Sequence, residues 1–223
     1  MARMTVRRMS GLSWLFQPRA ALASRDSRLL WWQAWLAGVG TTAVLYSLGS
    51  MARGAAHVLP ELALDRLIGY HPAAVWVYLS FFVLQAVAFW AVPEERRVAL
   101  TRAFAACAFV ALMVFIVWPT TLVQPPAPDS GSLALALVRW ADTPANCLPS
   151  LHAALSAVSA AALTLRRSAW ASVFAWLWAL SICWSAIATR QHLTIDIAAG
   201  WLLGCVAAFG FVREGVRSRP VCL

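Results

Sequence analysis

The stretch TRQHLTIDIAAGWLLGCVAAFGFV, residues 189–212, joins three ionisable side chains to an apolar run long enough to cross a membrane. Arg190, His192 and Asp196 all lie within its first eight positions. On a helix His192 and Asp196 would share one face, because they are four residues apart. An acid about one turn inside a membrane span is costly and usually functional, so the stretch predicts both a span and a site.

The rest of the 223-residue chain has the composition of a protein that crosses a membrane several times. Hydrophobic residues make up 61% of it, charged residues only 12%, and the mean hydropathy is +0.70. Six apolar segments have about the length of a membrane-spanning helix. They lie at about residues 29–49, 72–92, 100–118, 149–165, 168–188 and 192–212. We therefore predict an all-α, polytopic bundle of six transmembrane helices.

The basic residues predict the orientation of these helices. All 18 of them are arginine. With the N-terminus inside, 14 lie on the inner side, and the other four are Arg53, Arg66, Arg139 and Arg190. The positive-inside rule then places both termini in the cytoplasm, N-in and C-in. The predicted parts are a basic cytoplasmic segment (1–28), the six-span membrane domain (29–212) and a short basic cytoplasmic tail (213–223). This distribution accounts for the net charge of +9, so we expect no nucleic-acid partner.

This topology brings two distant motifs to the same outer face. NCLPSLHAAL (146–155) and TRQHLTID (189–196) both enter their spans from that side, which places His152 and His192 at similar depth. Two histidines and a carboxylate suit phosphoryl transfer through a covalent intermediate. One imidazole attacks phosphorus, the carboxylate fixes its tautomer, and the second histidine protonates the departing alkoxide.

The predicted site also contains groups that would hold the phosphate. Backbone N–H groups at the two helix starts, with Ser150 and Arg190, would bind its anionic oxygens. This chemistry requires neither a metal ion nor a cofactor. Taken alone, the His192–Asp196 pair fits a structural hydrogen bond equally well, and the isolated His57 and His71 fit tolerated interfacial residues.

The paired histidine motifs resemble a known family. PSLH (149–152), followed by TRQHLTIDIAAG (189–200), resembles the type 2 phosphatidic acid phosphatase superfamily of membrane lipid phosphatases. The chain looks most like a subgroup that includes inositol phosphorylceramide synthases. LDRLIGYHP (64–72), VYLSFF (77–82) and FIVWPTTLVQPP (115–126) are also similar to that subgroup. The resemblance implies that His192 is the nucleophile, Asp196 its orienting partner and His152 the acid for the leaving group.

The chain departs from the superfamily's pattern at its cationic positions. In the first motif, Lys-x6-Arg-Pro, Val117 stands where the lysine would be and Gln124 where the arginine would be. In the third motif Ala186 replaces the arginine. We therefore expect Arg190 to replace one of the missing phosphate-binding cations, with Arg139 as a second candidate. Gln124 completes the predicted phosphate-binding set.

These observations predict an integral-membrane lipid phosphatase that cleaves a phosphoester at the outer face through a phosphohistidine. The alternative is a phospholipid head-group phosphotransferase that uses the same histidines to pass the phosphoryl-bearing group to a lipid alcohol. A third hypothesis is a transporter or a non-catalytic membrane scaffold, although a transporter would more often have polar residues at mid-bilayer. The expected partner is a lipid phosphate within the bilayer. The expected location is a bacterial inner membrane, with the site facing the periplasm. The sequence leaves the oligomeric state open.

Overall fold

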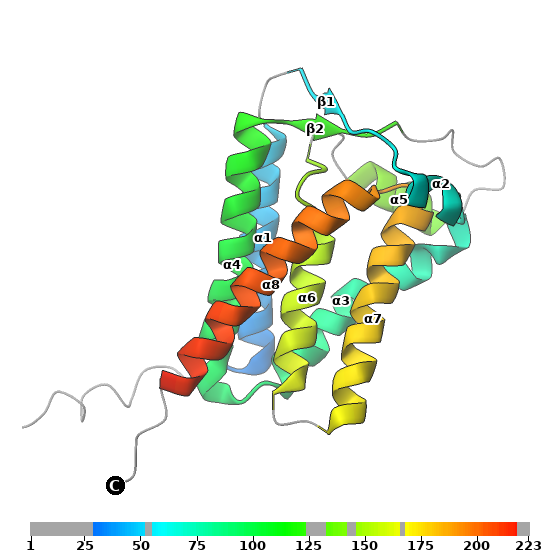
Figure 1. The fold of residues 1–223 in the computed structure, drawn as a ribbon. Coiled ribbons are helices and arrows are strands. Elements are labelled where there is room, and N and C mark those ends of the chain that lie inside the picture. Colours follow the sequence, from blue (N-terminus) through cyan, green and yellow to red (C-terminus); the bar gives the residue numbers. More distant parts are fainter. Residues whose placement is uncertain (1–28, 52–54, 124–132, 142–145, 166–167, 218–223) are drawn as a thin grey trace, which may run out of the picture.

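The computed structural model describes residues 29–51, 55–123, 133–141, 146–165 and 168–217, with only the backbone for 212–217. Within these residues, six helices of 14 to 24 residues form a bundle through which the chain passes back and forth (Figure 1). They are α1 (Trp31–Ser50), α3 (Val75–Ala91), α4 (Glu94–Val117), α6 (Leu151–Thr164), α7 (Ala169–Ala188) and α8 (Thr194–Arg217). The N-terminal segment 1–28 lies outside the described residues, and α8 extends to Arg217.

Four of the six predicted spans are confirmed as helices long and apolar enough to cross a membrane. They are Pro72–Ala91, Glu94–Val117, Ala169–Ala188 and Thr194–Phe211. The other two predicted segments are helical at the expected positions, but neither is among the helices long and apolar enough to cross a membrane. The first, α1, has 20 residues and contains tryptophan, glycine, threonine and serine, which lower its hydropathy. The second, α6, has only 14 residues.

The short α6 lies at the centre of the bundle, in contact with α3, α4, α7 and α8. Eleven of its residues are buried, and eight of those are alanine or serine. Small residues let neighbouring backbones approach closely, as they do in packed membrane helices. Gly200 and Gly204 of α8 lie against the backbone of Ser150 and Ala154, at the start of α6, with no room for a Cβ atom. Because other helices surround α6, its surface faces protein and not lipid, and small side chains suffice to cover it.

Several short elements cover one end of the bundle, and all but one of them, a 3-10 turn, lie between the predicted spans. They are β1 (His57–Val58), α2 (Ala63–Ile68), the 3-10 turn η3 (Pro72–Ala74), β2 (Thr120–Thr121) and α5 (Leu133–Ala141). The two strands are parallel, with His57 paired to Thr120 and Val58 to Thr121, and Thr120 also bridges to Asn146. These pairings connect the loops at the end of the bundle where α6 and α8 begin (Figure 1).

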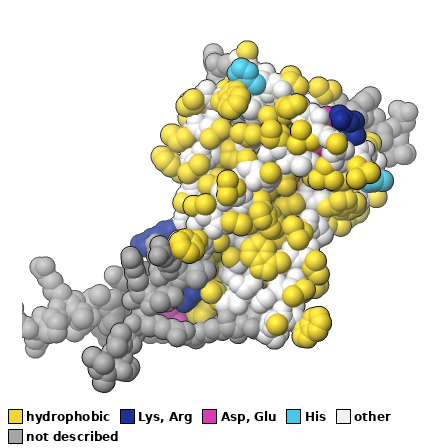
Figure 2. All heavy atoms as spheres, viewed as in Figure 1, with side chains coloured by type: hydrophobic (Ala, Val, Ile, Leu, Met, Phe, Trp, Pro, Cys, Tyr) yellow, Lys and Arg dark blue, Asp and Glu magenta, His cyan; other side chains and the backbone are white. Residues whose placement is uncertain are grey.

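The surface of the bundle agrees with a membrane location. Figure 2 shows apolar side chains spread over one face, with the coloured charged side chains near its two ends. Large side chains such as Phe82, Trp90, Phe174 and Leu202 are exposed along the helices. A soluble protein rarely exposes so continuous an apolar surface, whereas lipid chains cover it without cost.

Candidate active site

The turn between α7 and α8 positions His192. After α7 ends, the N–H groups of Gln191 and His192 both donate to the carbonyl oxygen of Ala186. His192 therefore lies in the turn, two residues before α8, and not inside the helix as the sequence predicted. Its Nδ1 atom is nevertheless 3.3 Å from Oδ2 of Asp196, which lies in the first turn of α8. Both side chains are buried, so the histidine–carboxylate pair forms one unit at the start of α8.

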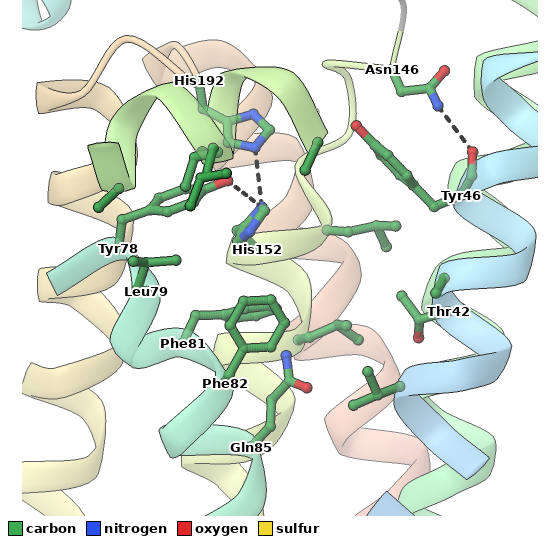
Figure 3. Close-up of a pocket in the computed structure, with 18 of the residues that line it drawn as sticks. Thr42, Tyr46, Tyr78, Leu79, Phe81, Phe82, Gln85, Asn146, His152 and His192 are labelled. Atoms are coloured by element: carbon green, nitrogen blue, oxygen red, sulfur yellow. Dashed lines mark hydrogen bonds between the residues drawn. The ribbon is translucent and has the colours of Figure 1, made fainter. Parts of the chain in front are cut away.

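His152, from the first turn of α6, completes the triad that the sequence predicted. Its Nδ1 atom lies 3.4 Å from Nε2 of His192, and the two ring centroids are 5.5 Å apart. His192 therefore has its two nitrogens in different environments, with Nδ1 facing the carboxylate of Asp196 and Nε2 facing His152 (Figure 3). An imidazole oriented this way carries its reactive lone pair on Nε2.

Tyr78 of α3 is a site residue that the sequence did not reveal. Its hydroxyl lies 3.2 Å from Nδ1 of His152, and its ring centroid is 4.4 Å from that of the imidazole. The ring of Phe81 lies 4.5 Å from His152, between centroids. Two aromatic rings thus fix the plane of His152 (Figure 3). The available signal was a tyrosine in the first turn of a largely apolar span, where one hydroxyl is easily overlooked.

Ser150 caps α6 and connects it to α8. Its Oγ atom accepts a hydrogen bond from the N–H of Ala153 at 3.3 Å, and its own N–H donates to the carbonyl oxygen of Asp196 at 3.1 Å. The residue is fully buried. The predicted phosphate-binding hydroxyl is therefore adjacent to both histidine motifs, where it sets the distance between the two helix starts.

The other three residues that the sequence predicted to bind phosphate are Arg190, Arg139 and Gln124. Arg190 forms an ion pair, at 2.9 Å, with Glu61, which lies on the loop before α2. Arg139 of α5 donates to the hydroxyl of Tyr70 at 3.3 Å and lies over that ring. Gln124 lies outside the described residues. The structure thus brings the two histidines, Asp196 and Ser150 together, and it places Arg139 on α5 and Arg190 in the turn between α7 and α8.

A second buried carboxylate, Asp65 of α2, holds the start of α8. Its Oδ1 atom accepts from the N–H and the hydroxyl of Thr194, at 2.7 and 2.6 Å, and its Oδ2 atom accepts from the N–H of Leu62 at 2.7 Å. A carboxylate at a helix N-terminus stabilises the unpaired N–H groups there. Asp65 is separated from Thr194 by 129 residues, so no local pattern predicted this contact.

A cavity of about 840 Å³ opens beside the histidines. His152 and His192 line one end of it, and α1, α3, α5 and α6 supply mainly apolar walls (Figure 3). Its volume lies within the range of pockets that bind small molecules and cofactors. An apolar chain would therefore fit beneath a phosphate that reaches the histidines.

Comparison with known families matches this region of the chain. Residues 99–218 match the model of the PAP2 superfamily. The chain belongs to the PAP2 superfamily. The match covers more than half of the chain, from α4 to α8, and includes both histidines and Asp196. No curated protein and no solved structure matches the chain.

Membership in the PAP2 superfamily agrees with the four long apolar helices. Together they identify a membrane protein of the phosphatase or phosphotransferase type. Residues of α1 and α3, including Tyr78, lie outside the matched part. The matched half therefore supplies the two histidine motifs, whereas one wall of the cavity belongs to the unmatched half.

Proposed function

We propose that the protein is a membrane lipid phosphatase that forms a phosphohistidine on His192. The observation that carries this proposal is the geometry of His192, with Nδ1 against the carboxylate of Asp196 and Nε2 toward His152 at the end of an apolar cavity. A nucleophile, the group that orients it and a proton donor are thus arranged in series.

The proposed reaction proceeds in two steps. The Nε2 lone pair of His192 attacks phosphorus, and the bond between phosphorus and the lipid oxygen breaks as His152 gives that oxygen a proton. Water then attacks the phosphohistidine, gives a proton to His152, and releases inorganic phosphate with His192 restored. Asp196 stabilises the positive charge that develops on the His192 ring.

The substrate proposed here is a lipid phosphate that enters from the bilayer. The cavity is largely apolar, and the surrounding helices expose apolar side chains to the lipid. Such walls favour a hydrocarbon chain over a sugar or nucleotide phosphate. A lipid would bring its phosphate to the histidines while its chain remains in the cavity.

Transfer of the phosphoryl-bearing group to a lipid alcohol is the second candidate function. The proposed nucleophile His192 is only 5% exposed and opens toward an apolar cavity, which limits the access of water to an intermediate. Such a site would admit a hydroxyl delivered by a second lipid. This second function also accords with the resemblance to inositol phosphorylceramide synthases.

We further propose that α1 and α6 complete six spans, with the histidines at the outer face and both termini in the cytoplasm. The alternating direction of the helices and the position of Arg96 and Arg97 at the end opposite the histidines support this orientation. Cysteines introduced at position 57, in β1, and at position 95, at the start of α4, provide the test. Only the first should react with an impermeant thiol reagent added outside intact cells.

The enzymatic proposal is tested with protein purified in detergent and a radiolabelled lipid phosphate. Release of inorganic phosphate indicates hydrolysis, whereas a new phospholipid in the presence of a lipid alcohol indicates transfer. We expect His192→Asn to lower either activity by at least about 10³-fold and to abolish an acid-labile labelled intermediate. Undiminished turnover by this variant would leave a transporter or a scaffold as the better description of any lipid binding.

A further inference from the structure

The cavity contains a buried polar side chain that the proposed chemistry does not use. Gln85 of α3 lines the cavity and is only 1% exposed. Its Oε1 atom has no hydrogen-bond partner among the described residues. A buried amide oxygen left unpaired destabilises a protein, so its presence requires a reason. A bound ligand that donates a hydrogen bond would supply one.

The position of Gln85 indicates which part of a ligand it would meet. It follows Tyr78 by seven residues and Phe81 by four, so all three share one face of α3. Seven residues correspond to about 10 Å along the helix. Figure 3 shows Gln85 and His192 at opposite ends of the cavity. The amide therefore lies beside the lipid portion of a substrate whose phosphate is at the histidines.

Two other polar groups on the cavity wall present the same kind of atom. The hydroxyl of Thr42, on α1, donates to the carbonyl oxygen of Gly38 at 2.9 Å, which leaves its oxygen as an acceptor. Asn146 donates from Nδ2 to the carbonyl oxygen of Tyr46 at 3.1 Å, and its buried Oδ1 atom has no partner among the described residues. Gln85 and Asn146, which line the cavity, thus each have an amide oxygen with no partner among the described residues, and Thr42 has a hydroxyl oxygen that can accept a further hydrogen bond. These acceptors favour a ligand with a hydrogen-bond donor.

We propose that the cavity binds the lipid portion of the substrate and that Gln85 accepts a hydrogen bond from a hydroxyl or amide N–H on it. This inference rests on the proposed lipid phosphatase function and specifies its substrate class. Gln85 determines specificity and takes no part in the chemical step. Gln85 and Thr42 both lie outside residues 99–218, the part that matches the PAP2 superfamily. The preference would therefore come from the half of the chain that the family model does not cover.

The test uses three synthetic lipid phosphates of equal chain length that differ at a single position. One has an amide N–H, one a hydroxyl and one an ester oxygen in its place. We expect kcat/KM of the wild-type protein to be about five- to tenfold higher for a donor-bearing lipid than for the ester. Comparison of the amide with the hydroxyl identifies which donor the cavity recognises.

Gln85→Met removes the amide and keeps the length of the side chain. We expect this variant to lose the preference for a donor-bearing lipid, so that its kcat/KM on the amide or hydroxyl lipid falls to about its own value on the ester lipid. Its Tm in detergent should rise, because an unpaired buried polar group has been removed. The matched control is Leu155→Met, in the same cavity, which should keep the preference.

The outcomes separate this inference from the function on which it rests. A wild-type protein with equal activity on all three lipids, or a Gln85→Met variant with an intact preference, overturns the inference and leaves the phosphatase standing. Absence of turnover and of a labelled histidine with all three lipids overturns both. Gln85→Asn, measured in parallel, retains an amide but withdraws it by one methylene, so it should weaken the preference if the inference is correct.

Discussion

His152 and His192, forty residues apart in the sequence, meet with Nδ1 of the first 3.4 Å from Nε2 of the second. Among the described residues, only His192 has a carboxylate at its other nitrogen. This asymmetry agrees with the different roles proposed for the two rings. A histidine backed by a carboxylate is suited to nucleophilic attack, and its neighbour is suited to proton transfer.

The roles are separable by the leaving group of the substrate. We expect His152→Asn to slow the first step on a long-chain alkyl phosphate by about 10²–10⁴-fold, because the departing alkoxide then lacks its proton donor. On a matched nitrophenyl phosphate, whose leaving group needs no proton, the loss in that step should be below about tenfold. Release of the leaving group in a single turnover provides the measurement, because phosphate release would also include the second step, in which His152 accepts a proton from water. Equal losses on the two substrates would assign His152 to another role.

Asp196 has a structural explanation as well as a catalytic one. Both of its carboxylate oxygens lie 3.2 Å from the N–H of Leu193, so the residue also caps α8. Asn can still accept from the N–H of Leu193 through its side-chain oxygen, but its amide cannot stabilise a charged imidazole. We expect Asp196→Asn to lower kcat by about 10²–10⁴-fold with little change in Tm. A lower Tm with normal kcat would indicate that capping is its main role.

The histidine–carboxylate part of the site could be predicted from the sequence because its determinants are local or topological. Four residues separate His192 from Asp196, and the alternation of spans brings His152 to the same end. Tyr78 could not be predicted in this way, since α3 is apolar on nearly all sides and its rotation is set by packing. The α5 helix was missed because its nine residues are far too few for a membrane span, and length was the criterion by which helices were predicted.

Arg190 illustrates a different limit of sequence analysis. A charge can be located in a sequence, but its partner cannot, and Glu61 is 129 residues away. The backbone of Arg190 is also in the left-handed region, with φ of 58°, where glycine is the favoured residue. A non-glycine residue at such a position is retained where its side chain has a use.

A pair of variants at Arg190 distinguishes the effect of backbone strain in the turn from the effect of the guanidinium group. Arg190→Gly relieves the backbone strain, whereas Arg190→Ala keeps a Cβ and should be less stable by about 1 kcal/mol. If the guanidinium binds phosphate, both variants should lose about 10–100-fold in kcat/KM despite their different Tm values. Glu61→Gln should lower KM, because the carboxylate no longer competes with phosphate for Arg190. Unchanged kcat/KM in both arginine variants would restrict Arg190 to the ion pair.

Tyr78 should act through His152. Tyr78→Phe keeps the ring that packs on the imidazole and removes the hydroxyl 3.2 Å from Nδ1. A hydrogen bond contributes about 1 kcal/mol net, so we expect a loss of about fivefold in kcat on alkyl phosphates and a smaller loss on nitrophenyl phosphates. Tyr46→Phe, in the same cavity, is the control and should leave this ratio unchanged. A Tyr78→Phe loss that is identical for both substrates would argue against an effect on proton transfer.

The close approach of α8 to α6 should be required for the spacing of the histidines. A Cβ atom on Gly200 would meet the carbonyl carbon of Ser150 at 2.9 Å, and backbone atoms have no rotamer by which to move away. We expect Gly200→Ala to destabilise the protein by about 1–3 kcal/mol and to lower activity, because Ser150 and Asp196 would be forced apart. Gly210→Ala is the matched control, since nothing lies within 4 Å of a Cβ atom there and alanine favours the helix by about 1 kcal/mol. Thermal unfolding in detergent, with phosphate release measured on the same samples, compares the two variants. A Gly200→Ala protein as stable and active as Gly210→Ala would show that the two helix starts tolerate a wider separation.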